Sequence, residues 1–328
     1  MTIKLTRRTL IRTGAVAATL PFLAAPAIAQ GWPNKPVKFV VSYPPGGATD
    51  IFARAYGEYI SKQLGQPVVV ENKAGAGGTV GAVEVKRSAA DGYTLLFTIS
   101  TTMIMNKVLY KNLPYDPDKD FVLIAYMPAG SLPTIVATST GVTNLKELAE
   151  YARKNKTNIG TYAAGSYAHL VVAELNKHYK LEMEAVHYRG ESPMWADFLT
   201  GSLQGGTGAW FVAQNVLQTG KGRAIAVSQK RMKKLPGVAS FAEQGVTSDV
   251  FRLQGFVCVV GPSGMPNEIT NRFSDLFVEA GKSEKVQSLL DQFGIDDSAI
   301  GRPGFEKLVK EEAPIWLNAV SSLGLTPE

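Results

Sequence analysis

The sequence predicts a two-lobed α/β fold in which each lobe is a mainly parallel sheet flanked by helices, hinged around a cleft. Short apolar, β-branched runs alternate with helical patterns along most of the 328 residues, as in parallel sheets. A chain of this length usually forms more than one domain. Proline- and glycine-rich breaks near 128–133 and 261–266 suggest that the chain leaves a first domain and later returns to it. We therefore assign residues 30–132 and 254–328 to lobe 1 and residues 133–253 to lobe 2.

The individual elements follow from this alternation of patterns. We expect strands at 37–42, 67–71, 93–98, 134–138, 158–162, 183–188, 224–228 and 256–260. We expect helices at 49–64, 79–88, 144–155, 167–179 and 192–200, with about three more after Pro266. Ligands of such folds bind in the crevice outside the carboxyl ends of the strands, so the loops that follow the strands are the places to search.

The first 29 residues predict a secretory signal peptide. A basic segment without acids precedes an apolar run at 15–25 and a small-residue cleavage site at Ala27-Ile28-Ala29. Its bases are Lys4, Arg7, Arg8 and Arg12. The arginine pair also fits twin-arginine export, but general secretory leaders contain such pairs too, so the route stays open. We expect a periplasmic protein that is cleaved near Ala29.

Charge and cysteine content narrow the possible partners. The chain has 34 basic and 28 acidic residues, and the leader contributes four of the bases, so the mature chain has 30 minus 28, or a net charge of +2. This small excess gives little support to nucleic-acid binding. The single Cys258 cannot form an internal disulfide and is expected to be a buried thiol. No later stretch is apolar enough to span a membrane.

No catalytic constellation can be assembled from the sequence. His169, His178 and His187 are spaced nine residues apart, which does not suit metal ligands on one helix, and a single cysteine cannot form a zinc cluster. No G-x-S-x-G motif is present. We therefore expect a protein that is not an enzyme and needs no cofactor or metal.

The segment ENKAGAGGTVGA (residues 71–82) approximates a dinucleotide-binding fingerprint. Val80 stands where the final glycine belongs, and Gly81 comes one residue late. An exported chain also argues against a soluble nicotinamide cofactor. We interpret this loop as a structural turn or as lining of the cleft, rather than as a cofactor site.

Several predicted strands end in small and hydroxyl residues just where a helix begins. These strand ends are YPPGGATD (43–50), TISTT (98–102), TYAAGSYAH (161–169) and HYRG (187–190). Serine and threonine are common helix N-caps, so each segment alone fits a cap as well as a ligand contact. Their recurrence on both sides of a crevice favours binding, because converging helix N-termini and hydroxyls stabilise a carboxylate without a lysine or arginine.

Several motifs in order resemble a known family. The segments WPNKPVKFVVSYPPGGATD, GQPVVVENKAGAGGTVGA, DGYTLL, LPYDPDKDF and HYRG are similar to those of the receptors of tripartite tricarboxylate transport systems, the Bug-type periplasmic binding proteins. The resemblance runs from Trp32 to the C-terminus. It implies a periplasmic binding protein fold that closes on a small organic carboxylate and delivers it to membrane permease subunits. Nothing in the sequence requires more than a monomer.

The resemblance also implies a set of ligand-binding residues. In the family, the loop like 43–50 and the loop like 164–169 hold one carboxylate through backbone amides, hydroxyls and bridging waters. Carried over by position, lobe 1 would contribute Tyr43, Gly46, Gly47, Ala48 and Thr49, with Ser100, Thr101 and Thr102 reaching the rest of the ligand. Lobe 2 would contribute Gly165, Ser166 and His169, with Gly190 permitting a close backbone approach.

Departures from the family pattern bear on the ligand. The family usually has an acidic residue near 205–209, where this chain has only small residues followed by Trp210. The missing acid argues against an amino acid ligand, and the run of small residues makes room for a larger, flatter solute that Trp210 would contact. Trp195 replaces a small residue, and Arg189 offers a planar fork for a carboxylate. The alternative is that Trp195 packs between elements while Arg189 faces solvent. We expect a dicarboxylate or an aromatic carboxylate without an amino group.

Two other functions stay open at this point. A sensor receptor would present its loaded form to a membrane kinase through the same closure, which the sequence cannot distinguish from uptake. An exported α/β enzyme acting on small acids would need an acid–base pair that the sequence does not reveal.

Overall fold

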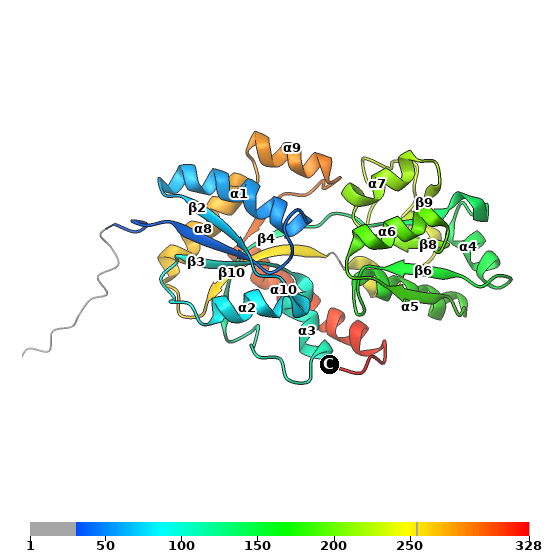
Figure 1. Ribbon diagram of the computed structural model, residues 1–328, viewed down its shortest axis with the longest axis horizontal. Coiled ribbons are helices and arrows are strands. Elements are labelled where there is room, and N and C mark those ends of the chain that lie inside the picture. Colours follow the sequence, from blue (N-terminus) through cyan, green and yellow to red (C-terminus); the bar gives the residue numbers. More distant parts are fainter. Residues whose placement is uncertain (1–30, 254, 328) are drawn as a thin grey trace, which may run out of the picture.

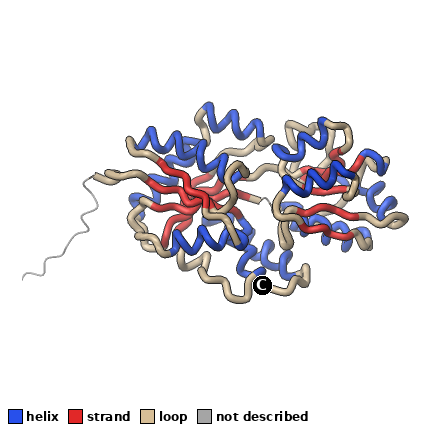
Figure 2. Tube along the Cα trace, viewed as in Figure 1, coloured by secondary structure: helices blue, strands red, loops and turns tan. Residues whose placement is uncertain are grey.

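The computed structural model describes residues 31–253 and 255–327, so the predicted signal peptide lies outside the described residues. Two α/β units stand side by side, and each has a sheet at its centre with helices packed around it (Figures 1 and 2). This arrangement confirms the predicted fold class. The domain boundaries at 132/133 and 253/254 stay a prediction.

Sheet 1 has six strands in the order β11-β4-β10-β3-β1-β2. Their bounds are β1 Val37–Val41, β2 Val68–Asn72, β3 Thr94–Ile99, β4 Phe121–Pro128, β10 Phe256–Pro262 and β11 Ile300–Gly301. β1 runs parallel to both β2 and β3. The carboxyl ends of these three strands therefore meet at one edge of the sheet, and the loops that follow β1 and β3 lie there together.

Sheet 2 has five strands in the order β7-β6-β8-β5-β9. Their bounds are β5 Pro133–Ala137, β6 Asn158–Thr161, β7 Glu184–His187, β8 Gly205–Thr207 and β9 Gly222–Val227. β6 runs parallel to both β7 and β8, so the loops after these three strands also share one edge.

The strand directions are mixed in both sheets, whereas the sequence predicted mainly parallel ones. β10 is antiparallel to β3 and β4, and β5 is antiparallel to β8 and β9. The chain passes from sheet 1 to sheet 2 between β4 and β5, and it returns between β9 and β10. Strands that carry the chain out of a sheet and back into it lie next to each other and run in opposite directions.

Ten α-helices cover the sheets in the described part of the chain. Those around sheet 1 are α1 Ala48–Leu64, α2 Thr79–Lys86, α3 Asn106–Leu109, α8 Asn267–Ala280, α9 Glu284–Gln292 and α10 Arg302–Ser321. Those around sheet 2 are α4 Leu145–Ala152, α5 Tyr167–Tyr179, α6 Glu191–Thr200 and α7 Trp210–Gln218. A π-helix at Thr101–Met105 joins β3 to α3. No helix among the described residues is long and apolar enough to cross a membrane.

The sheet 1 core is rich in aromatic side chains. Phe39 of β1 and Phe97 of β3 pack on Phe277 of α8, with ring centroids 5.9 and 5.8 Å from that ring. All three side chains are fully buried. Burying rings of this size stabilises the unit by roughly 1.5–3 kcal/mol each. This core fixes the direction in which β1 and β3 deliver their loops to the sheet edge.

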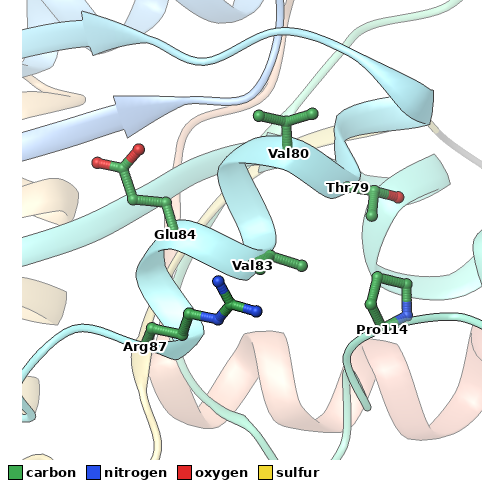
Figure 3. Close-up of a pocket in the computed structure, with 6 residues that line it drawn as sticks. All are labelled: Thr79, Val80, Val83, Glu84, Arg87 and Pro114. Carbon is green, nitrogen blue, oxygen red and sulfur yellow. The ribbon is translucent and has the colours of Figure 1, made fainter.

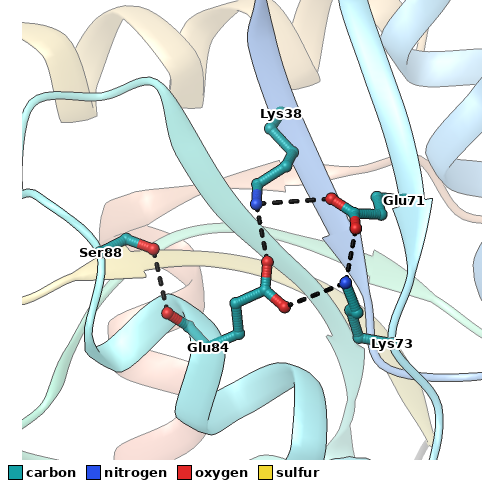
Figure 4. A network of polar contacts seen from close by, with 5 residues as sticks. All are labelled: Lys38, Glu71, Lys73, Glu84 and Ser88. Atoms are coloured by element: carbon teal, nitrogen blue, oxygen red, sulfur yellow. Dashed lines mark hydrogen bonds and ion pairs between the residues drawn. The ribbon is translucent and has the colours of Figure 1, made fainter.

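A surface ion network joins α2 to β1, to the edge strand β2 and to the residue that follows β2. Lys38 Nζ lies 2.7 Å from Glu84 and 3.4 Å from Glu71, and Lys73 Nζ lies 2.6 Å from Glu71 and 3.6 Å from Glu84 (Figure 4). Hydrogen bonding to Glu84, outweighing partial burial, raises the pKa of Lys38. Because the four side chains reach solvent, these pairs contribute little to stability.

Candidate functional site

The loop after β1 is organised by one carboxylate. Asp50 Oδ2 accepts hydrogen bonds from the Gly46 amide (2.9 Å) and from Arg54 Nε (3.0 Å), while Oδ1 accepts from Asn72 Nδ2 (3.0 Å). Burial alone would raise the pKa of Asp50, but these bonds outweigh it and hold the pKa below its ordinary value. The Gly46 amide is therefore engaged inside the loop.

The residues at the start of α1 are not all occupied by the hydrogen bonds of Asp50, and some remain accessible to a ligand. Gly47 is the N-cap, in an extended conformation, and Gly46, Gly47 and Ala48 are exposed. The amides of Ala48 and Thr49 belong to the first helical turn, where N–H groups have no partner within the helix. The Thr49 side chain is 6% exposed. The loop can thus offer a carboxylate main-chain donors rather than a lysine or arginine.

Asp50→Asn should lower stability at neutral pH by about 1–3 kcal/mol, because it weakens hydrogen bonds to a buried charged group. Because the folded pKa lies below the ordinary value of 3.8, ionised Asp50 stabilises the native state above pH 3.8. That contribution disappears as pH falls through the lower folded pKa, so the variant should show a flatter stability profile below about pH 4. Urea unfolding between pH 2.5 and 7 measures this, with exposed Asp118→Asn as the control; equal profiles in wild type and Asp50→Asn would contradict it.

The loop after β3 lies beside the first loop. The Tyr43 hydroxyl lies 3.1 Å from Thr102 Oγ1, and Thr102 Oγ1 donates to the Gly77 carbonyl at 2.9 Å. Thr102 is fully buried and Ser100 is 4% exposed, whereas Thr101 is half-buried. The structure therefore brings Tyr43 and Thr102 together. The proton of the Thr102 hydroxyl is used in the hydrogen bond to the neighbouring glycine turn.

The glycine turn at residues 75–78 has a packing role. A Cβ at Gly78 would lie 2.2 Å from Thr102 Oγ1, and a Cβ at Gly81 would lie 2.9 Å from the Cβ of Ser42. Gly78 also has φ +90°, a conformation that favours glycine. These glycines allow α2 to approach the strand ends closely, which agrees with the interpretation of this loop as a structural turn.

The loop after β6 supplies the cap of α5. Ser166 accepts from the His169 amide, as an N-cap does, and its hydroxyl donates to the Ala163 carbonyl at 2.6 Å. His169 Nδ1 accepts from the Gly165 amide at 3.2 Å, and its ring centroid lies 4.5 Å from that of His187. Burial, followed by repulsion from His187, lowers the pKa of His169 to about 4. This loop is therefore uncharged at neutral pH.

The remaining predicted residues of the second group occupy different environments. Gly190, with φ +111°, is the N-cap of α6, and its amide donates to the Tyr162 carbonyl at 2.9 Å. Nothing lies within 4 Å of its missing Cβ. Arg189 is exposed. Trp195 is 3% exposed, and its ring packs against Phe198 inside the second unit.

Trp210 is half-buried at the start of α7 and reaches the first unit. A Cβ at Gly294, which follows α9, would lie 3.0 Å from Trp210 Cδ1. The neighbouring Phe211 stacks on Phe293 with centroids 4.3 Å apart. Trp210 therefore packs between the units, and a role in lining a ligand site remains a prediction.

The two strand-end edges meet in space. A Cβ at Gly165, in the loop after β6, would lie 2.7 Å from Leu109 Cδ2, in the helix that continues from the loop after β3. Gly165 also has φ +69°, so both its backbone conformation and its close approach require glycine. The predicted residues thus form two groups, one on each edge, and no hydrogen bond in the described structure joins one group directly to the other.

One residue that the sequence-based prediction omitted stands between the loops of sheet 2. Glu191 opens α6, and both of its carboxylate oxygens accept from the Ala209 amide, at 3.0 and 3.1 Å. The sequence stretch 205–209 lacks an acid, but the fold brings this carboxylate to it. The identity of residue 191 was visible in the sequence, whereas its contact with Ala209 depends on the pairing of β6 with β7 and β8.

A surface hollow lies away from these loops. It is lined by Thr79, Val80, Val83, Glu84, Arg87 and Pro114 on the outer side of α2 (Figure 3). None of the predicted ligand-binding residues lines it, so it does not bear on the site at the strand ends.

Two α/β units, with glycine- and hydroxyl-rich loops at strand ends that meet between them, define a two-lobed solute-binding receptor. The chain belongs to the tripartite tricarboxylate transporter family receptors (TctC), whose family model matches residues 52–325. The protein is therefore a receptor of a periplasmic transport family and not an enzyme, which confirms the resemblance seen in the sequence.

Relatives agree with this assignment. Protein BugT of Bordetella pertussis (strain Tohama I) is 29% identical over 308 residues, covering 92% of this chain and 93% of BugT. The structure of R. palustris Rpa4515 with adipate has a TM-score of 0.81 at 27% identity, covering 90% of this chain and 100% of that one. MatC (Rpa3494) from Rhodopseudomonas palustris with bound malate has a TM-score of 0.73 at 28% identity, covering 88% and 99%.

Proposed function

We propose that the protein binds a small organic carboxylate without an amino group, either a dicarboxylate or an aromatic carboxylate, and delivers it to the membrane permease of a tripartite system. The start of α1, exposed at Gly47 and Ala48 and lying near the contact between the loops of the two sheets, is the observation that carries this proposal. Similar proteins have been solved with adipate and with malate, which are dicarboxylates.

In this proposal the main chain holds one carboxylate. The amides of Ala48 and Thr49 donate from lobe 1, and the loop from Gly165 to His169 closes over the ligand from lobe 2. The neutral His169 of that loop adds no charge, so oriented backbone dipoles provide the attraction. Closure of the two lobes then creates the form that the permease recognises.

A ligand panel tests this proposal. The exported protein should show a raised melting temperature with at least one aliphatic dicarboxylate or aromatic carboxylate, because a ligand that binds only the folded state stabilises it. Calorimetry on the same acids then gives the affinities. Stabilisation by amino acids or sugars, with none by any of the acids, would contradict the proposal.

A further inference from the structure

Glu191 is held at the sheet 2 edge with most of its hydrogen-bonding capacity unused. Its two oxygens share a single donor, the Ala209 amide. An ionised carboxylate can accept about four hydrogen bonds. Gly190 and Trp210, both predicted ligand contacts, are the sequence neighbours of the two residues in this bond.

No cation compensates this carboxylate within the described residues. Glu191 forms no ion pair there, and the elements packed most extensively on α6, which are β6, β8 and α7, carry no charged side chain. Lys221 bonds to the far end of α6, at the Leu199 carbonyl. Tyr162, in the loop after β6, is the titratable neighbour. Burial raises the pKa of Glu191 to about 7. The side chain is half-buried, and within the described residues the chain supplies only the Ala209 amide to this carboxylate.

A second unsatisfied group lies one helical turn further along α6. Trp195 is 3% exposed, and its Nε1–H has no hydrogen-bond acceptor in the described structure. A Cβ at Gly208 would lie 3.1 Å from Trp195 Nε1 and also 3.1 Å from Glu191 Oε2. The unpaired donor and the under-used acceptor therefore border the same small space, which glycine leaves free of a side chain.

We propose that Glu191 and Trp195 form a subsite that binds a hydroxyl group of the carboxylate ligand. The hydroxyl donates to the Glu191 carboxylate and accepts from Trp195 Nε1–H, so both unsatisfied groups are paired. An ammonium group in this space could donate to Glu191 but could not accept the hydrogen bond of the Trp195 indole. A second carboxylate there could accept from the indole, but it has no proton to donate to Glu191 and would be repelled by its charge. The preferred ligand is then a hydroxy-substituted carboxylate, an inference that rests on the proposed function.

Matched pairs of acids test this subsite. Calorimetry at pH 8, where Glu191 is mostly ionised, compares malate with succinate and 4-hydroxybenzoate with benzoate, and includes aspartate. Wild type should bind the hydroxylated member of at least one pair about tenfold more tightly. Glu191→Ala should bring that ratio close to one, because the hydroxyl of the hydroxylated acid loses its acceptor. Trp195→Phe, which keeps most of the buried volume, should lower the ratio several-fold.

The control is Glu182→Ala, which removes an exposed acid before β7 and should leave the ratio unchanged. Equal affinity of wild type for both members of each pair would overturn this inference alone, as would an unchanged ratio in Glu191→Ala. Tighter binding of aspartate than of malate would overturn it in favour of an ammonium group. Absence of binding for every acid would overturn the proposed function and this inference with it.

Discussion

A glutamate in place of Ala48 should weaken carboxylate binding about 100-fold or more while leaving the melting temperature of the free protein unchanged or slightly raised. Ala48 is exposed in the first turn of α1, so the new charge would stand where the ligand carboxylate is proposed to bind. Two like charges about 4 Å apart near a protein surface repel by roughly 4 kcal/mol. An acid at a helix N-terminus is itself stabilising by about 0.3–1 kcal/mol.

Calorimetry with the tightest-binding acid measures this effect. Gln63→Glu is the matched control, because it adds the same charge to an exposed position in the last turn of the same helix. The control should bind within about twofold of wild type, since its charge lies more than one Debye length away. Equal affinities of Ala48→Glu and Gln63→Glu would show that the carboxylate does not bind at the start of α1.

Gly78→Ala should destabilise the protein by about 2–5 kcal/mol. The added Cβ would approach Thr102 Oγ1 to 2.2 Å, and overpacking of this kind costs roughly 1–3 kcal/mol. The residue also has φ +90°, which adds about 1–2 kcal/mol of backbone strain for a residue with a Cβ. Displacement of Thr102 would in addition disturb its contact with Tyr43.

Gly141→Ala separates the two contributions to that loss. Gly141 has φ +73° and nothing within 4 Å of its missing Cβ, so alanine there adds backbone strain without a clash. Urea unfolding of both variants should give a difference of about 1–3 kcal/mol, which is the packing contribution. Equal losses would mean that the glycine turn does not need its close approach to Thr102.

The sequence predicted most elements of this fold because their patterns are local. The run VKFVV and the helix that follows its proline–glycine turn lie where the alternation placed them. β8, with the sequence GGT, was not predicted because three small residues carry no β-branched or apolar signal. The mixed strand directions were not predicted either. They depend on the pairing of the strands at which the chain passes from one unit to the other, and local sequence patterns do not reveal that pairing.

The sequence indicated those residues of the candidate site whose role depends on their own backbone conformation. Gly165 and Gly190 have the positive φ that a close turn requires, and both lie at the carboxyl ends of strands. Glu191 was missed because its partner amide is 18 residues away in the sequence. Trp195 could not be distinguished from an ordinary core residue by sequence, because its unpaired indole N–H becomes evident only when its neighbours are known.

The proposal that oriented main-chain groups hold an organic anion between the two units is tested most directly by a crystal structure with the tightest-binding acid from the panel. One carboxylate of that acid should lie within about 3.2 Å of the backbone nitrogens of Ala48 and Thr49, with the loop at Gly165 and Ser166 on its other side. A ligand bound through lysine or arginine side chains, or away from these strand ends, would contradict it.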